Sequence, residues 1–357
     1  MMVAAGASSS IVLLDRGSVA FARMLSAIRT ATKTVHLEVY AISVSGIGGL
    51  FIAALKDAAH RGVEVRVVVD AWGTGHVAAG IVATLRVAGC DAIVYNPIWR
   101  GILYRQRWRN HRKILVVDER IAFVGGINLV DYFVGERAWA DVAVEIHGPA
   151  CAELAHRLRH EPHSDHANGL HVLVSNVGGG RRLRRRYLKA FGAAHQRILL
   201  AHSYFLPDRG FLRSITAAAR RGVRVTLLVP GVSDVPLARA TTALIYKRLL
   251  AAGVEVYELD GAILHAKLGV FDGARLLVGS FNLDPYSLAD LEVLVDAREA
   301  TVAEQATKWI ETHLEHSHRI SDARPKGGKL RRLWERLKGE LGLWLARSIG
   351  RMMAARR

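Results

Sequence analysis

Cysteine and long apolar runs are the features that this chain of 357 residues has least of. Cys90 and Cys151 are its two cysteines, and neither belongs to a Cys-x-x-Cys pair. This argues against a disulfide framework or a structural zinc site and suits a reducing compartment. No window reaches the ~18 uncharged apolar residues of a membrane span, and the N-terminal segment lacks a convincing signal peptide. We therefore expect a soluble, cytosol-facing body.

Acidic residues are also scarce relative to basic ones. The chain has 49 Lys and Arg against 32 Asp and Glu, which gives a formal net charge of +17. Such a balance favours an anionic partner, whether nucleic acid, a membrane surface or a phosphate-bearing substrate. Because 51% of the residues are hydrophobic, the chain can bury one large core or two domain-sized cores.

One polar motif is present in two copies, 154 residues apart. The first copy consists of His111, Lys113 and Asp118, followed by Gly126 and Asn128. The second consists of His265, Lys267 and Asp272, followed by Ser280 and Asn282. Corresponding residues have the same spacing in both copies, including the tails. Chance does not supply two such matches, so the motif indicates an internal duplication.

The segments around the motifs repeat as well. Amphipathic stretches that end at Arg61-Gly62 and Arg221-Gly222 predict helices closed by a C-terminal glycine, and alternating apolar segments after them predict buried strands. This order, used twice, predicts an α/β fold of two pseudo-twofold-related repeats, each a mixed sheet flanked by helices. We place an N-terminal repeat at 1–170, a C-terminal repeat at 171–323 and a basic amphipathic tail at 324–357.

The motif residues suit the splitting and remaking of a phosphodiester. Residues at i and i+2 of a strand share one face, so each motif histidine points the same way as its lysine. If the halves pack face to face, one His can attack phosphorus to give a phosphohistidine, while the other transfers protons to and from the alcohols. The groups expected to bind the phosphate are the two lysines with Asn128, Asn282, Gly126 and Ser280. No metal or cofactor is required.

Each imidazole also needs a carboxylate to hold its tautomer. Asp141, 30 residues after His111, and Glu292, 27 residues after His265, are assigned this role. Asp118 and Asp272 complete the motif's catalytic set, but as residues at strand ends we expect them to brace loops rather than touch substrate.

These residues resemble the phospholipase D superfamily, whose signature is this doubled motif, and within it the B type of the bacterial cardiolipin synthases. The segments that carry the resemblance are 111–128, 204–236 and 264–287. The resemblance implies that a phosphatidyl group passes from one phosphatidylglycerol to another, giving cardiolipin and glycerol. It also implies that His111 is the nucleophile, and it leaves the acceptor alcohol and the oligomeric state undetermined.

The second copy departs from the family pattern after Ser287. The segment from Ser287 to Glu292 is one residue shorter than in the family and has Asp290 in place of Asn. Glu292 is therefore expected to reach the site only if a bulge or a shifted strand register compensates.

Two basic segments with tryptophan predict contact with an anionic membrane. Residues 324–357 contain 11 Lys and Arg against two Glu, with Trp334 and Trp344 in an apolar stripe of helical spacing. Trp99 and Trp108 alternate with arginines just before His111. Ordinary packing of a terminal helix and a solvated loop are the alternatives, and Arg181 to Arg186 is interpreted as an exposed basic linker. We expect a peripheral protein on the cytoplasmic face of the bacterial cell membrane.

Two other functions stay open. A nuclease or other phosphodiesterase of the same superfamily would use the positive charge to bind a nucleic-acid backbone, although we do not expect a nucleic-acid partner. A non-catalytic lipid-binding protein is less consistent with two intact motifs.

Overall fold

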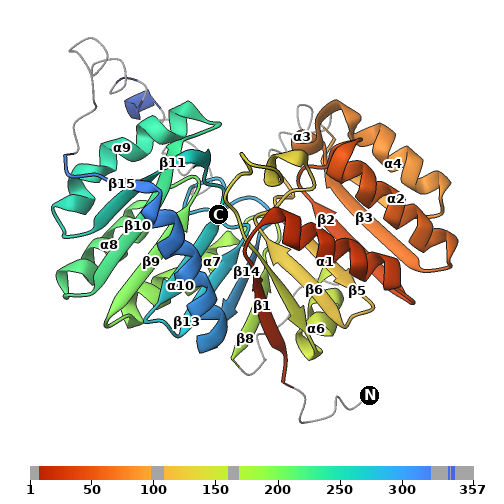
Figure 1. Cartoon of the computed structure of the whole chain (residues 1–357), viewed down its shortest axis with the longest axis horizontal. Helices are drawn as coiled ribbons and strands as arrows, with labels where there is room; N and C mark the ends of the chain where they lie inside the picture. Colours follow the sequence, from red (N-terminus) through yellow and green to blue (C-terminus); the bar gives the residue numbers. More distant parts are fainter. Residues whose placement is uncertain (1–7, 98–107, 160–168, 323–336, 338, 342–357) are drawn as a thin grey trace.

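Two sheets with matching strand order form the body of the molecule (Figure 1). The computed structural model describes residues 8–97, 108–159, 169–322, 337 and 339–341. The first half contains β1 (Ser10–Leu14), α1 (Gly17–Thr30), β2 (Thr34–Val39), α2 (Gly46–His60), β3 (Glu64–Asp70), α3 (Ala71–Thr74), η1 (Gly75–Val77), α4 (Ala78–Val87), β4 (Asp91–Tyr95), β5 (Ile114–Val117), β6 (Ile121–Gly125), η2 (Asp131–Phe133), β7 (Ala143–His147) and α6 (Pro149–Arg159).

The second half repeats this order and adds one strand. It contains β8 (Leu170–Val174), α7 (Gly180–Ala193), β9 (Arg197–His202), α8 (Arg209–Arg220), β10 (Arg224–Val232), α9 (Pro236–Leu250), β11 (Glu255–Ile263), β12 (Lys267–Phe271), β13 (Arg275–Gly279), β14 (Val293–Ala297), α10 (Ala300–Glu315) and β15 (Ser317–Arg319).

Both sheets are mixed. The first has the order β1-β7-β6-β5-β2-β3-β4, and the second has β8-β14-β13-β12-β9-β10-β11 with β15 added at the edge. In each sheet three strands connected through helices run parallel, and the motif strand, β5 or β12, pairs antiparallel with the first of them. The predicted α/β fold of two similar repeats, each a mixed sheet flanked by helices, is confirmed.

The two sheets share one core between their inner faces. Alternate residues of the motif strands, Ile114 and Val116 in β5 and Leu268 and Val270 in β12, belong to a single buried apolar cluster. The outer faces are covered by α1, α2 and α4 in the first half and by α7, α8 and α9 in the second. One helix of each half also packs against the other half. Helix α6 of the first half contacts β8, and α10 of the second half contacts β1. This reciprocal packing fixes how the two motifs face each other.

The basic segment at 181–186 lies in helix α7 and is not a linker. Leu183, Tyr187 and Ala190 are buried at helical spacing, and this periodicity outweighs the arginines between them. Arg184 binds both carboxylate oxygens of Asp208, at 2.6 and 3.0 Å. Among the described residues, no helix has both the length and the apolar character that crossing a bilayer demands.

Candidate active site

Two short parallel bridges between the halves assemble the site. Asn110 pairs with Leu291, and Ala140 pairs with Leu264. The amide of His111 donates to the Leu291 carbonyl at 2.9 Å, and the amide of His265 donates to the Ala140 carbonyl at 2.8 Å. Because each bridge is parallel, the residues that follow its two partners also lie side by side. His111 therefore meets Glu292, and His265 meets Asp141.

His111 is oriented by a carboxylate from the opposite half. Its Nδ1 lies 3.1 and 3.2 Å from the two carboxylate oxygens of Glu292. The hydroxyl of Ser287 donates to Glu292 at 2.7 Å, and the hydroxyl of Ser280 donates to the other carboxylate oxygen. Burial lowers the pKa of His111 well below its usual value and raises the pKa of Glu292 to about 7. The buried pair therefore favours one shared proton over two full charges.

His265 has the mirrored arrangement with a shorter acid. Its Nδ1 lies 2.7 Å from Asp141 Oδ2, while Asp141 Oδ1 accepts the amide of Val142 at 2.8 Å. Aromatic rings surround the imidazole, with ring centroids of Phe133 and Trp139 at 5.6 and 5.5 Å. Burial, and then the Lys267 ammonium, lower the pKa of His265 to about 4.

Both lysines lie at the site and are buried. Lys113 Nζ donates to the His111 carbonyl at 2.7 Å, and Lys267 Nζ donates to the His265 carbonyl and lies 3.1 Å from His265 Nδ1. Burial lowers the pKa of Lys113 to about 7 and that of Lys267 to about 8. An incoming anion would stabilise both ammonium groups, because it supplies the counter-charge that the protein provides only in part.

The two asparagines are held by their oxygens. Asn128 Oδ1 accepts the amide of Ala41 at 3.2 Å, and Asn282 Oδ1 accepts the hydroxyl of Ser203 at 3.0 Å. Because the oxygen of each side-chain amide accepts this hydrogen bond, its NH₂ group points away from that contact. The arrangement suits donation to a phosphate oxygen.

Gly126 and Ser280 have a different role from the one expected. Their backbone amides donate to the Val142 and Val293 carbonyls within the sheets, so these amides do not face a phosphate. A Cβ at position 126 would lie 2.4 Å from a carboxylate oxygen of Asp141, whereas the Ser280 hydroxyl donates to Glu292. Gly126 therefore leaves room for the Asp141 carboxylate, and Ser280 holds the Glu292 carboxylate.

Asp118 and Asp272 lie outside the site, as the bracing role requires, and the catalytic assignment needs correction. The Asp118 carboxylate accepts the backbone amides of residues 32–34, and the Asp272 carboxylate accepts those of residues 195–197. Each follows the end of its motif strand opposite to the histidine, and each has a left-handed φ of 52°. They fix turns.

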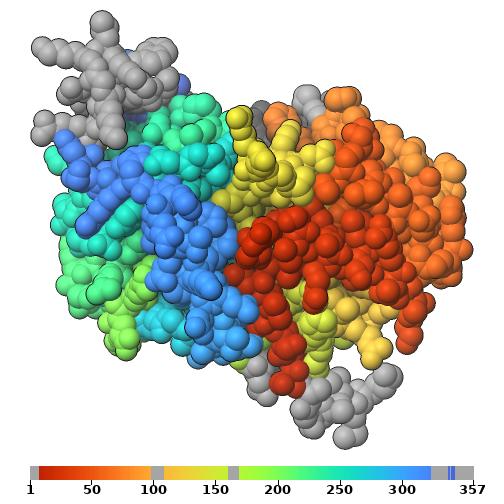
Figure 2. All heavy atoms as spheres, in the orientation of Figure 1, coloured from red at the N-terminus to blue at the C-terminus, as the bar shows by residue number. Residues whose placement is uncertain are grey.

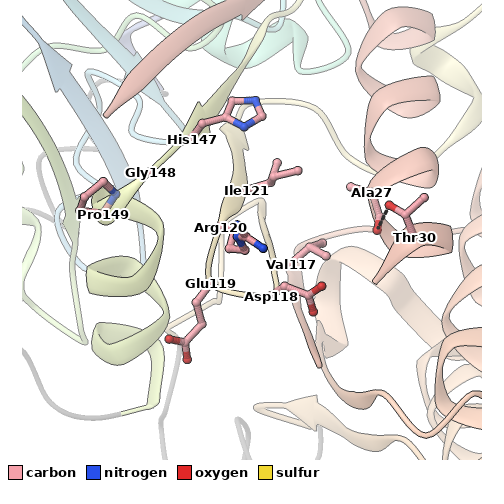
Figure 3. Close-up of a pocket in the computed structure, with 10 residues that line it drawn as sticks. All are labelled: Ala27, Thr30, Val117, Asp118, Glu119, Arg120, Ile121, His147, Gly148 and Pro149. Carbon is pink, nitrogen blue, oxygen red and sulfur yellow. Dashed lines mark hydrogen bonds between the residues drawn. The ribbon is translucent and has the colours of Figure 1, made fainter. Parts of the chain in front are cut away.

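A hollow of ≈660 Å³ lies beside Asp118, at that far end of β5 (Figure 3). Ten residues line it: Ala27, Thr30, Val117, Asp118, Glu119, Arg120, Ile121, His147, Gly148 and Pro149. Neither motif histidine nor either motif lysine belongs to it. We assign this hollow no part in the chemistry.

Glu292 reaches the site without a bulge. Gly125 pairs with Ala143 in the first sheet and Gly279 with Leu294 in the second, so Asp141 and Glu292 each lie two residues before the paired strand residue. The shortening is absorbed in the turn before Glu292, where the amide of Asp290 donates to the Tyr286 carbonyl. Asp290 itself accepts the Arg109 amide at 2.9 Å.

Two tyrosines at the site were missed from the sequence. The ring of Tyr40 lies 4.9 Å from Lys113 Nζ and 5.0 Å from the His111 ring, and that of Tyr204 lies 6.0 Å from Lys267 Nζ. Each follows the carboxyl end of a strand that begins a parallel run, β2 or β9, where sites in such sheets gather. That position was the available signal.

Of the four tryptophans predicted to contact the membrane, the structure describes Trp108 alone. Trp99, Trp334 and Trp344 lie outside the described residues. Trp108 is half-buried, and its carbonyl accepts the Asn96 side-chain amide at 2.7 Å.

A family model described as "Cardiolipin synthase, PLD-like domain" matches residues 24–161 and 187–314. The chain belongs to this family. Relatives include cardiolipin synthase B of Salmonella typhi, 34% identical over 79% of this chain and 74% of that protein, and cardiolipin synthase B of Escherichia coli K12, 32% identical over the same shares. The resemblance to the phospholipase D superfamily is confirmed, and the chain is a phosphatidyltransferase of that superfamily.

Solved structures share the fold of this family at low sequence identity. Phosphatidylserine synthase of Haemophilus influenzae matches with a TM-score of 0.72 and 14% identity, over 96% of this chain and 93% of that one. A polyphosphate kinase of Porphyromonas gingivalis matches with a TM-score of 0.61 and 17% identity, over 93% and 53%. They support the two-repeat fold and nothing finer.

Proposed function

We propose that the protein is a cardiolipin synthase that transfers a phosphatidyl group between two phosphatidylglycerol molecules through a phosphohistidine and releases glycerol. The observation that carries this proposal is the crossed pairing of His111 with Glu292 and of His265 with Asp141. It gives one site two imidazoles, each held at Nδ1 by a buried carboxylate, with Nε2 left for chemistry.

In the first step His111 acts as the nucleophile. With Nδ1 hydrogen-bonded to Glu292, the Nε2 lone pair attacks phosphorus, and the bond from phosphorus to the glycerol headgroup oxygen breaks. His265 donates its proton to that leaving oxygen, and glycerol departs. The phosphate charge raises the low pKa of His265, so the imidazole can be protonated once substrate is bound.

In the second step the same groups act in reverse. His265, now neutral, removes the proton from a hydroxyl of the second phosphatidylglycerol, and the oxygen attacks the phosphohistidine phosphorus. The bond from His111 Nε2 to phosphorus breaks, and cardiolipin forms. Lys113, Lys267 and the amides of Asn128 and Asn282 stabilise the oxygens as charge builds on them.

The partners follow from this chemistry. The substrates are phospholipids, and the protein would act at the anionic surface of the bacterial cell membrane, on its cytoplasmic face. Other alcohols, phosphatidylethanolamine or water could serve as acceptors, because burial of the site sets how far water competes.

Lipid analysis after incubation with phosphatidylglycerol vesicles, without added metal, tests the proposal. We expect cardiolipin and glycerol in equal amounts, and loss of both in His111→Ala and in His265→Ala. Phosphatidic acid as the sole product would indicate a hydrolase. Cleavage of oligonucleotides without lipid turnover would indicate a nuclease.

Trapping the intermediate tests the roles of the two histidines. Phosphatidylglycerol labelled with ³²P should leave label on the protein after a rapid quench in base, where phosphohistidine is stable. The label should disappear in His111→Ala. Label that persists in His111→Ala but is absent from His265→Ala would reverse the roles.

A further inference from the structure

Three aromatic side chains stand exposed around the site. Trp72, Tyr132 and Tyr286 are 62%, 60% and 46% exposed, and in the part of the chain that the structure describes no other aromatic residue is classed as exposed. They come from three separate connections: α3 after β3, η2 after β6, and the loop between β13 and β14. The fold, rather than one local segment, therefore brings these three residues to the site. We call these three residues the aromatic rim.

Ring contacts or chain neighbours connect each rim residue to the site. Tyr132 stacks on Trp139 with centroids 5.1 Å apart, and Trp139 lies 5.5 Å from the His265 ring. The Trp72 ring lies 5.4 Å from the guanidinium of Arg109, two residues before His111. Tyr286 directly precedes Ser287, whose hydroxyl holds Glu292. The rim thus borders the site from both halves.

Apolar and basic side chains extend the rim. Val44 on the connection after β2, Val232 at the end of β10 and Val235 just before α9 are also exposed. Arg181 is exposed at the start of α7, directly after Gly180, which lies against Ser287 and Leu288. The yellow segment that contains η2 lies between α9 and α3 in Figure 1 and protrudes there in Figure 2.

We propose that the aromatic rim inserts into the headgroup layer of an anionic phospholipid bilayer, so that the site opens directly onto the membrane. The inference rests on the proposed function, since lipid substrates must reach a buried site while their acyl chains stay in the bilayer. Tryptophan and tyrosine are the side chains that settle at this interface, where one end of the ring is apolar and the other wet.

The position of the rim favours a bilayer over a protein partner. A protein seated on Trp72, Tyr132 and Tyr286 together would cover the entrance to the site, whereas a fluid lipid layer would supply substrate through it. The chain's formal net charge of +17 adds attraction to an anionic leaflet.

Site-specific labels test this orientation in the full chain. Cys90 and Cys151 are buried, so a cysteine introduced at the surface can be labelled alone. An environment-sensitive fluorophore at Tyr132→Cys or Tyr286→Cys should shift to the blue on vesicles of phosphatidylglycerol and phosphatidylcholine, and nitroxide-labelled lipid should quench it. The same fluorophore at Val87→Cys, on α4 and 91% exposed, should do neither. Rim labels that behave like the Val87→Cys label, for instance because another segment or a protein contact binds instead, would overturn the proposal.

Sedimentation with the same vesicles gives the second measurement. Replacing all three rim residues by alanine should weaken partitioning to vesicles by about tenfold or more, whereas Val19→Ser with Val87→Ser should leave it unchanged. Equal partitioning of the two variants contradicts the proposal. Both measurements record binding, not turnover. Absence of turnover on detergent-dispersed phosphatidylglycerol would instead defeat the proposed function.

Discussion

The two halves hold equivalent histidines by different means. Beneath His111 the first half buries charged and polar side chains: Arg112 donates to Glu38 at 3.1 Å, and Asn110 donates to the same carboxylate at 2.8 Å. The strand registers make Ala201 the residue equivalent to Glu38, and the motif spacing places Leu264 and Ala266 where the first half has Asn110 and Arg112. The second half is apolar at all three positions.

The comparison separates the groups that the proposed chemistry uses from the side chains that support them. Both halves keep the histidine, the lysine, the asparagine and the crossed carboxylate. The support below them has diverged. In the first half Arg112 also reaches across to the Ser175 carbonyl at 2.6 Å, whereas the second half lacks this arginine and packs the rings of Phe133 and Trp139 against His265. The first-half network is thus a brace between halves, and each support can be removed separately.

The largest effects are expected at the crossed carboxylates. Glu292→Gln and Asp141→Asn keep shape but cannot hold the imidazolium, so each should lower kcat by roughly 10²–10⁴-fold. Steady-state turnover of phosphatidylglycerol measures this, with urea midpoints as the control for folding. Normal turnover in either variant would show that the crossed pair on that side is only structural.

The buried brace should rank next, as a loss of stability. Arg112→Ala leaves Glu38 buried without its main counter-charge, and we expect the free energy of unfolding to fall by about 3–5 kcal/mol. Glu38→Ala with Arg112→Ala, which reproduces Ala201 and Ala266 of the second half, should cost less than the two single changes added together. Urea unfolding of all four proteins closes this cycle. Strict additivity would contradict a direct interaction.

The sequence revealed the fold and the motif residues because each depends on local pattern. Alternating and helical periodicity marked the repeated elements, and the doubled spacing marked both histidines and both lysines. The sequence could not show which carboxylate contacts which histidine. Asp141 lies closer along the chain to His111 than to His265, yet it contacts His265. That pairing depends on the bridges Asn110 to Leu291 and Ala140 to Leu264, which exist only between packed halves. The helix at 181–186 was missed because charge hid its buried stripe.

A histidine present in one half alone should give a smaller, pH-dependent effect. Burial, and then Lys267, lower the pKa of His202 to about 3, and neither ring nitrogen has a hydrogen-bond partner among the residues that the structure describes. The unfolded chain takes up a proton near pH 6.5 and the folded chain does not, so stability falls as pH drops from about 6.5 toward 3. The repeat places Val39 at this position. His202→Val should recover about 2 kcal/mol at pH 5 relative to pH 8, as measured by unfolding at both pH values. If the free energy of unfolding kept the same pH dependence in this variant, His202 would not be the source of the acid sensitivity.

The smallest effect is expected where the two carboxylates differ in their support. Ser280 donates to Glu292 and accepts the Val293 amide at 3.0 Å, whereas Gly126 offers Asp141 only space. Ser280→Gly gives the second copy the first copy's residue and removes one of the two hydroxyls that hold Glu292. Because Ser287 remains, we expect kcat to fall by about tenfold, the loss of one charge-assisted hydrogen bond. Ser287→Ala is the matched variant and should fall similarly. A loss as large as that of Glu292→Gln would mean that one hydroxyl alone keeps the carboxylate against His111, and that the two halves differ in mechanism as well as in support.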